Sequence, residues 1–282
     1  MMTFLFSSAG MRIRAGLARL STPAWFSPPV DLAPLERPLL VLAIFFPLSM
    51  VLMFGADAQL GLWMKSFPSH LRGVARWIAD LGEGIEVMVV AGLVVILSIF
   101  VPAERWRKRA VVGASAVTVA AAFIFLSVAG GGLVDALVKN IIRRARPGLM
   151  DAHGHLYFQP VSFTANFAAF PSGHSATAGA MALALALVFP RLRSILIPIG
   201  ALICLSRQAV GAHWSSDALM GWGVGVSFTF WLAHMFARRG LLFDYDRDGR
   251  LKRRRGHRVT AALVDAIRTG AVPTRPRPRP GQ

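Results

Sequence analysis

The chain has 282 residues, of which 55% are hydrophobic and 16% are charged, and its mean hydropathy is +0.54. This composition indicates an integral membrane protein and argues against a soluble one. The formal net charge of +17 does not indicate nucleic-acid binding, because much of it lies in the tail after Ala237 and no nucleic-acid-reading motif accompanies it. The single cysteine, Cys204, cannot form an intrachain disulfide, so cysteine usage leaves the redox compartment open.

Six apolar segments are predicted to cross the membrane as a bundle of helices, which makes the fold all-α and polytopic. The fifth is the weakest, because its charge-free length is short for a span. Residues 11–20 are predicted as an interfacial helix, and residues 57–86 as a loop with an amphipathic piece on the membrane surface. The six spans cover about residues 39–56, 87–103, 110–134, 174–189, 194–206 and 217–237.

The spans divide the chain into an N-terminal segment (1–37), a six-span membrane domain (38–237) and a basic, largely disordered tail (238–282). Six spans place both termini on one side, together with the basic turns at 105–109 and 191–193. Basic loops mark the cytoplasmic side, so we expect a multi-pass protein of the cell (inner) membrane with both termini in the cytoplasm. The opposite, periplasmic face then holds the span ends that carry three polar clusters.

One cluster lies between the fifth and sixth spans. His213 and Asp217 are four residues apart, so both would project from one face of a helix. A carboxylate beside an imidazole fixes its tautomer and raises its basicity, which suits a nucleophile. Arg207 precedes them and presents a planar fork of donors that fits phosphate. The alternatives are a His–Asp pair that merely caps a membrane helix and an arginine that snorkels to the interface.

A second cluster, Pro171-Ser172-Gly173-His174, lies where a loop becomes a helix. Backbone N–H groups at a helix N-terminus bind anions, glycine permits close approach, and the Ser172 hydroxyl adds a donor. His174 is then placed to act as a general acid. Simple N-capping by Ser172 is the alternative for that residue alone.

A third cluster follows the third span. Lys139 and Arg146 are seven residues apart and would share a face if the helix continues to Pro147, with Arg143 near that face. The alternative is the basic flank of a transmembrane helix. That alternative is weakened because this end faces the non-basic side of the protein.

The three patterns, in this order and spacing, resemble the membrane branch of the type-2 phosphatidic-acid phosphatase superfamily over about residues 39–237. The resemblance implies a metal-independent and cofactor-free phosphatase of lipid phosphates, with residues 38–237 as its catalytic domain. His213 would attack phosphorus and form a phosphohistidine, Asp217 would orient it, and His174 would protonate the leaving alkoxide. The phosphoryl oxygens would be held by Lys139, Arg146, Ser172, Gly173 and Arg207. Arg143 and Arg144 are not motif positions, and headgroup contact is the hypothesis for them.

Several alternatives stay open. The same intermediate would serve a lipid phosphotransferase, whereas a transporter or non-catalytic scaffold gives no reason for nucleophile, acid and anion clamp to share one face. Haloperoxidases share the motif plan but are soluble. The sequence does not decide among phosphatidylglycerophosphate, phosphatidate, a polyprenyl diphosphate and a lipid A phosphate, and it predicts no oligomeric state. His153 and His155 lack a third metal ligand and are interpreted as surface or headgroup contacts.

Overall fold

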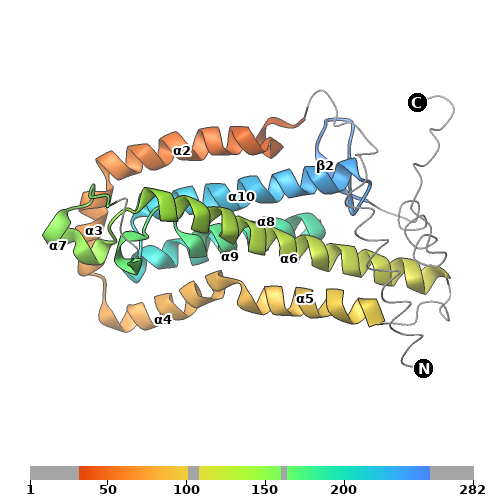
Figure 1. The fold of residues 1–282 in the computed structure, drawn as a ribbon, viewed down its shortest axis with the longest axis horizontal. Helices are drawn as coiled ribbons and strands as arrows, with labels where there is room; N and C mark the ends of the chain where they lie inside the picture. Colours follow the sequence, from red (N-terminus) through yellow and green to blue (C-terminus); the bar gives the residue numbers. More distant parts are fainter. Residues whose placement is uncertain (1–31, 101–107, 160–163, 255–282) are drawn as a thin grey trace. The chain divides into compact units, whose positions relative to one another are not determined.

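The computed structural model describes residues 32–100, 108–159 and 164–254. The predictions for the N-terminal interfacial helix, the basic turn at 105–109 and the Pro-Arg end of the tail lie wholly or mostly outside these residues. The elements, shown in Figure 1, are η1 (Pro34–Glu36), α2 (Pro38–Gly55), α3 (Asp57–Lys65), α4 (Ser69–Asp80), η2 (Leu81–Glu83), α5 (Ile85–Phe100), α6 (Lys108–Ile142), η4 (Pro147–Leu149), α7 (Met150–His153), η5 (Ala165–Phe167), α8 (Gly173–Val188), η6 (Pro190–Leu192), α9 (Arg193–Ala209), α10 (Ser215–Arg238), β1 (Phe243–Tyr245) and β2 (Leu251–Arg253).

The prediction of an all-α, polytopic membrane fold is confirmed, apart from one short hairpin. Among the described residues, five helical stretches are long and apolar enough to cross a membrane, namely Pro38–Gly55, Ser69–Phe100, Gly113–Ile142, Pro190–Ala209 and Ser215–Arg238. The fourth predicted span, residues 174–189, corresponds to α8, which has 16 residues and falls short of that length. The count of six therefore stays a prediction.

The chain forms two compact units. The larger unit contains Ala33–Val89 and Ile124–Leu232. The described part of the other unit contains a small aromatic cluster, in which the ring of Phe123 meets those of Phe236 and Phe243 at centroid distances of 5.3 and 4.8 Å. Phe243 begins the antiparallel hairpin β1–β2, in which it pairs with Arg253. These strands lie in the tail that is predicted to be largely disordered, and Phe243 buries its ring against this cluster; residues 255–282 of the tail lie outside the described residues.

α8 forms the core of the larger unit. Most of its residues are buried, and its apolar side chains pack in a cluster with α4, α5, α6 and α9. α10 approaches α8 closely because glycines face it: a methyl group on Gly221 would overlap the carbonyl of Ser172, and one on Gly225 would overlap the carbonyl of Ala176. Small residues at helix contacts allow membrane helices to pack backbone against backbone. This contact brings the first turns of the two helices together, and the backbone N–H of Ser172 donates to the carbonyl of Asp217 over 3.0 Å.

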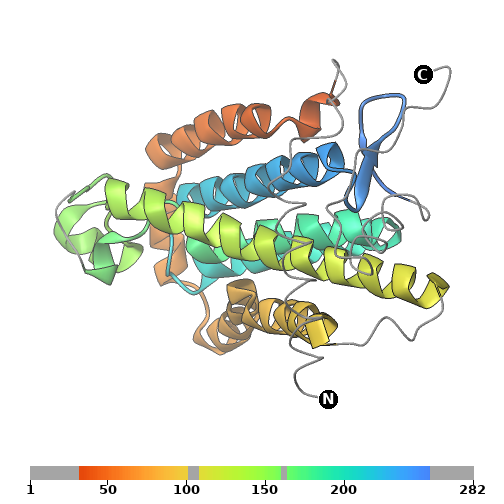
Figure 2. The same ribbon diagram turned by 45° about the vertical axis from the view of Figure 1, so that its right-hand side comes forward.

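The stretch predicted as a loop with an amphipathic piece, residues 57–86, is mostly helical, as α3, α4 and η2. Ala75 and Ala79 of α4 are buried, and α4 packs against α9. Gly61 lets α3 approach the ring of Trp214, and the carbonyl of Gly82 accepts a hydrogen bond from the hydroxyl of Thr177 on α8. Small residues such as these allow close helix contacts without adding to the apolar face of an amphipathic helix, so the sequence pattern indicates a surface segment. Both ribbon views place α3 and α7 at the same end of this unit (Figures 1 and 2).

Candidate active site

The end of α6 shapes the basic cluster. α6 ends at Ile142, and Arg143 has a left-handed backbone with φ of 53°, while its N–H still donates to the carbonyl of Lys139 over 3.1 Å. The chain then runs extended, and the N–H of Arg146 donates to the carbonyl of Asn166 over 2.9 Å. The condition for Lys139 and Arg146 to share one helix face, a helix that continues to Pro147, is therefore not met. A left-handed residue after the last turn ends the helix four residues before Arg146.

The ammonium of Lys139 lies against the first residue of α8. Its Nζ is 2.7 Å from Oδ2 of Asp135, one helical turn earlier. A Cβ built on Gly173 would lie 2.6 Å from the same Nζ, so a side chain at position 173 would compete with the ammonium for space. Ser172 makes no side-chain capping bond to the helix, and its hydroxyl instead accepts from Ser175 over 3.2 Å. The structure thus gives no support to simple capping by Ser172.

Arg146 and Arg207 bring further hydrogen-bond donors to the site around Lys139 and the N-terminus of α8. Within the part of the chain that the structure describes, the Nε atoms of Arg146 and Arg207 are buried without a hydrogen-bond partner. Burial lowers the pKa of Arg146, while the carboxylate of Asp217 opposes this effect. The two guanidinium groups also lie close enough to repel each other. Buried like charges with orphaned donors are unfavourable until an anion compensates them, so the arrangement favours an anion site.

His174 occupies the centre of these charges. The side chains of Lys139, Arg146, Arg207 and His213 all act on it electrostatically. The structure therefore brings together in space the residues that the three sequence clusters singled out, from α6, the following loop, α8, α9 and the turn before α10. Their chemical roles stay predictions.

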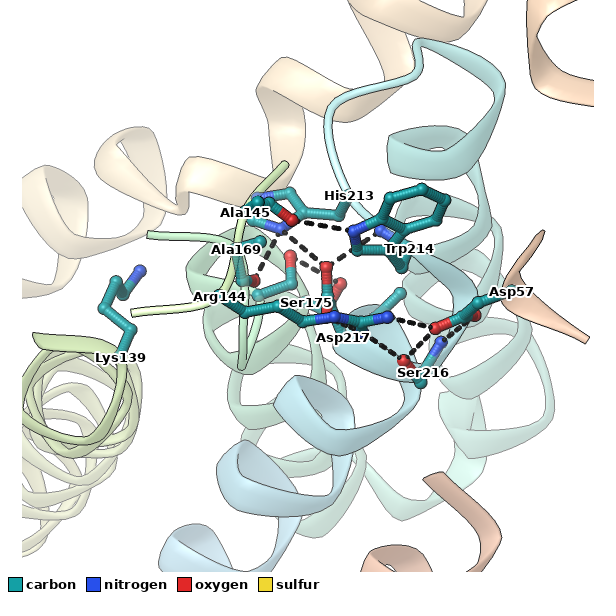
Figure 3. A network of polar contacts seen from close by, with 12 residues as sticks. Asp57, Lys139, Arg144, Ala145, Ala169, Ser175, His213, Trp214, Ser216 and Asp217 are labelled. Carbon is teal, nitrogen blue, oxygen red and sulfur yellow. Dashed lines mark hydrogen bonds and ion pairs between the residues drawn. The ribbon is translucent and has the colours of Figure 1, made fainter. Parts of the chain in front are cut away.

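His213 is held with one ring nitrogen free (Figure 3). Its Nδ1 is 2.9 Å from the carbonyl oxygen of Ala169. Because a carbonyl only accepts, Nδ1 carries the proton and Nε2 keeps its lone pair. The side chain is 2% exposed, and this burial lowers the pKa of His213, while Asp217 opposes the shift. The result is an imidazole whose Nε2 keeps its lone pair, which the predicted role of His213 as nucleophile requires.

The sequence predicts that His213 and Asp217 project from one face of a helix, but the structure arranges them differently. α10 begins at Ser215, so His213 lies before the helix, and the separation of its Nδ1 from Oδ2 of Asp217 is 3.8 Å, too long for a hydrogen bond. The same Oδ2 accepts from the backbone N–H of Trp214 over 2.9 Å. This backward reach closes the first turn of α10, as the acidic residue of a capping box does. Asp217 therefore holds the turn that carries His213 and places its charge nearby.

Two residues that fix the position of Asp217 were not predicted from the sequence. Arg144 is fully buried, and its Nη1 donates to Oδ1 of Asp217 and to the hydroxyl of Ser216, both over 2.7 Å. Its Nη2 donates to Oδ2 of Asp57 over 2.9 Å. Headgroup contact is therefore wrong for Arg144, because its guanidinium is enclosed in protein. Arg143 is also mostly buried, and its Nε donates to the carbonyl of Asn140 over 3.1 Å.

Asp57 is the first residue of α3 and is fully buried. Its Oδ1 accepts from the backbone N–H of Ser216 over 3.1 Å, and its Oδ2 accepts from the Ser216 hydroxyl. One signal could have found it: Asp57 directly follows the first predicted span. By the same counting of spans it belongs to the face that holds the three clusters. Arg144 had no such signal, since it is one of several arginines after α6.

The two histidines of the loop contribute structure here. The ring of His153 stacks on that of Tyr157 at a centroid distance of 4.3 Å. The backbone carbonyl of His155 accepts from Nε and Nη2 of Arg144, over 3.1 and 2.8 Å. His155 thus supports the buried guanidinium through its main chain.

A carboxylate from the stretch predicted as a surface segment also reaches the site. Oε1 of Glu83, in η2, is 3.3 Å from Nε2 of His174. Both side chains are partly exposed, so this contact lies at the solvent side of the site. Glu83 was missed because the segment around it has the pattern of an amphipathic surface helix.

Comparison with known proteins gives matches over the part of the chain that carries the motifs. Residues 120–241 match the model of the PAP2 superfamily. Two proteins named lipid A 1-phosphatase, from Rhizobium johnstonii and Rhizobium etli, are each 42% identical over 128 residues, which is 45% of this chain and 52% and 55% of theirs. The matched segment thus spans about half the length of these relatives. A crystal structure described as the first transmembrane PAP2 type phosphatidylglycerolphosphate phosphatase from Bacillus subtilis is 20% identical, with a TM-score of 0.49, over 71% of this chain and 95% of that one.

Proposed function

We propose, from the match of residues 120–241 to the PAP2 superfamily model, that the chain is a membrane phosphatase that hydrolyses a phosphate monoester or diphosphate on a lipid. One observation carries the proposal. The Nε atoms of Arg146 and Arg207, buried and unpartnered among the described residues, accompany the ammonium of Lys139 and the N-terminus of α8 around two histidines. This is the charge pattern that stabilises a transferring phosphoryl group.

The first step forms a bond between Nε2 of His213 and phosphorus, while the bond from phosphorus to the lipid oxygen breaks. His174 gives its proton to the departing oxygen, so a monoester leaves an alcohol and a diphosphate leaves a lipid monophosphate. The three cations, with the Ser172 hydroxyl and the Gly173 amide, hold the phosphoryl oxygens through both steps. In the second step water attacks phosphorus, the bond from phosphorus to Nε2 of His213 breaks, and His174 accepts a proton from the water. Inorganic phosphate is released, and neutral His213 and protonated His174 are restored. No step requires a metal ion.

The relatives named lipid A 1-phosphatase support a lipid A 1-phosphate as the first substrate to test. Phosphatidylglycerophosphate, phosphatidate and a polyprenyl diphosphate belong to the same panel, because each presents a phosphate at the headgroup level. The apolar helices support a multi-pass protein, and we infer from the basic loops that the site faces the periplasm with both termini in the cytoplasm. Cysteine labelling from either side of the membrane tests this orientation.

The test is phosphate release by the purified protein from each lipid of the panel, with a chelator present. We expect activity to survive chelation and His213→Ala to abolish it. His70→Ala, an exposed histidine of α4, is the matched control and should retain activity. Turnover by His213→Ala at the wild-type rate would refute the nucleophile assignment. Release of phosphate only when a second lipid alcohol is supplied would identify a phosphotransferase instead, since the same intermediate would then be captured by that alcohol.

A further inference from the structure

Behind the nucleophile lies a buried group of three charges, shown in Figure 3. Asp57, Arg144 and Asp217 are each fully buried, and the guanidinium lies between the two carboxylates at 2.9 and 2.7 Å. Two carboxylates and one guanidinium give the group a formal charge of −1. Ser216 connects two of them, because its hydroxyl accepts from Arg144 and donates to Asp57.

Arg144 alone would work against the chemistry of the nucleophile. When Nε2 of His213 bonds to phosphorus while Nδ1 keeps its proton, the imidazole ring becomes cationic. Asp217 is the nearest carboxylate, at 3.8 Å, but its other oxygen forms an ion pair with Arg144 at 2.7 Å. In a buried setting this cation would cancel much of the field that Asp217 exerts on His213. Within the described residues, the other ionisable groups that act on His213 are Arg146, Arg207 and His174, none of which is a carboxylate.

Asp57 offsets this cancellation from the far side of the guanidinium. Its Oδ2 lies 2.9 Å from Nη2 of Arg144, the nitrogen that does not contact Asp217. The charge of Arg144 is therefore shared between two carboxylates, and one net negative charge remains beside His213. Asp57 lies on α3, outside the matched PAP2 segment, and α3 approaches through Gly61, where a Cβ would lie 2.6 Å from the Trp214 ring.

We propose that Asp57 and Arg144 are positioning residues for the nucleophile: Arg144 holds Asp217 in place, and Asp57 restores the net negative charge that stabilises His213 as it becomes a cationic phosphohistidine. The proposal rests on the proposed phosphatase function, since it needs the phosphohistidine. Neither residue touches the substrate. The competing account is purely structural, because Asp57 also ties α3 to the first turn of α10 through the backbone of Ser216.

Charge balance separates the two accounts. Asp57→Asn keeps the size of the side chain and leaves the group with no net charge. The double variant Asp57→Asn, Arg144→Met removes both partners, so Asp217 keeps its own negative charge. We expect Asp57→Asn to slow formation of the phosphoenzyme on the order of tenfold, and the double variant to recover part of that rate. If the contacts act only structurally, the double variant must be slower still, because it has lost more hydrogen bonds.

The rate of phosphoenzyme formation is measured as the pre-steady-state burst of p-nitrophenol from p-nitrophenyl phosphate, with the thermal midpoint of each purified variant recorded beside it. Ser216→Ala is the uncharged comparison; it removes hydrogen bonds from the same group and should slow the burst less than Asp57→Asn. An unchanged burst in Asp57→Asn, or a double variant as slow as the single one, overturns the proposal.

If Asp57→Asn does not fold, the folded double variant is compared directly with the wild type. A burst within about tenfold of wild type supports the charge account, and one below a hundredth overturns it. A wild-type protein that releases no phosphate and forms no phosphoenzyme contradicts the proposed function itself. Failure of the charge rescue in an active enzyme contradicts only this inference.

Discussion

Gly173→Ala tests the geometry of the anion site without removing any charged group. The added Cβ would lie 2.6 Å from Nζ of Lys139 and 3.3 Å from Oδ2 of Asp135. Ordinary contacts between such atoms begin near 3.5 Å, so Nζ must retreat by about an ångström. It is the end of a flexible side chain, and it moves more easily than the first turn of α8. The ammonium is thereby displaced from the helix N-terminus, where the phosphoryl oxygens are expected.

The magnitude follows from what one charged contact contributes. Removal of one donor to a developing anion lowers the rate by about 10²–10³-fold, and a displaced ammonium should lose part of that, about tenfold to a hundredfold in kcat/KM. The free energy of unfolding should rise or stay constant, because alanine is favoured over glycine in a helix by about 0.5–1 kcal/mol. Reduced activity in a protein that is at least as stable is the signature of this perturbation.

The assay is phosphate release by purified variants, with thermal unfolding measured on the same samples. Gly73→Ala in α4 is the matched control, since a Cβ there meets nothing within 4 Å. Wild-type kcat/KM in Gly173→Ala, together with a large loss in Lys139→Ala, would refute the placement of the ammonium against α8. Parallel loss of activity and stability would show that the backbone, and not the lysine, absorbs the added methyl group.

Three further predictions concern the acid, the nucleophile and the helix contact. Glu83→Gln should slow hydrolysis of an alkyl phosphate by roughly two- to fivefold, because it removes a carboxylate that favours protonated His174. Hydrolysis of an aryl phosphate with a good leaving group should be unaffected, and an equal loss on both substrates would contradict this prediction. Burial lowers the pKa of His213 from 6.5, so the attacking neutral form persists below that pH. The acid limb of the pH profile of kcat/KM for an aryl phosphate should therefore lie below pH 6.5. An acid limb above pH 6.5 that the titration of the substrate does not explain would refute the lowered pKa. Gly225→Ala should lower the free energy of unfolding by about 1–3 kcal/mol, and with it the thermal midpoint, because the added methyl group meets the carbonyl of Ala176. An unchanged midpoint would contradict the close contact of α8 and α10.

Much of the candidate site was accessible from the sequence because its chemistry is local. Pro171 to His174 carries a small-residue helix start in four consecutive residues, and Ser206 to Asp217 carries arginine, histidine and carboxylate within one seam. Counting spans then predicted that these seams share one face. The structure brings these residues together, although α8 is shorter than a full span and the count of six stays a prediction.

The contacts that the sequence could not predict come from chain segments far apart. Nothing in the run of basic residues after α6 distinguishes Arg144 from its neighbours. In the structure, Arg143 has a left-handed backbone and the side chain of Arg144, the next residue, is buried. Asp57 is 87 residues away from Arg144 in the chain, and their ion pair exists only because α3 packs beneath the turn before α10.

The sequence by itself determined the membrane-bound class, the helical segments and the residues that suit phosphoryl chemistry, because hydropathy and motif spacing are properties of short stretches. Only the tertiary structure decided that a backbone carbonyl, from Ala169, takes the hydrogen bond of His213, and that Asp217 acts from the first turn of α10 with Arg144 behind it. The physical reason is that burial and partner choice depend on which segments meet. A charged side chain at the end of an apolar segment looks the same in sequence whether it faces lipid headgroups or an enclosed partner.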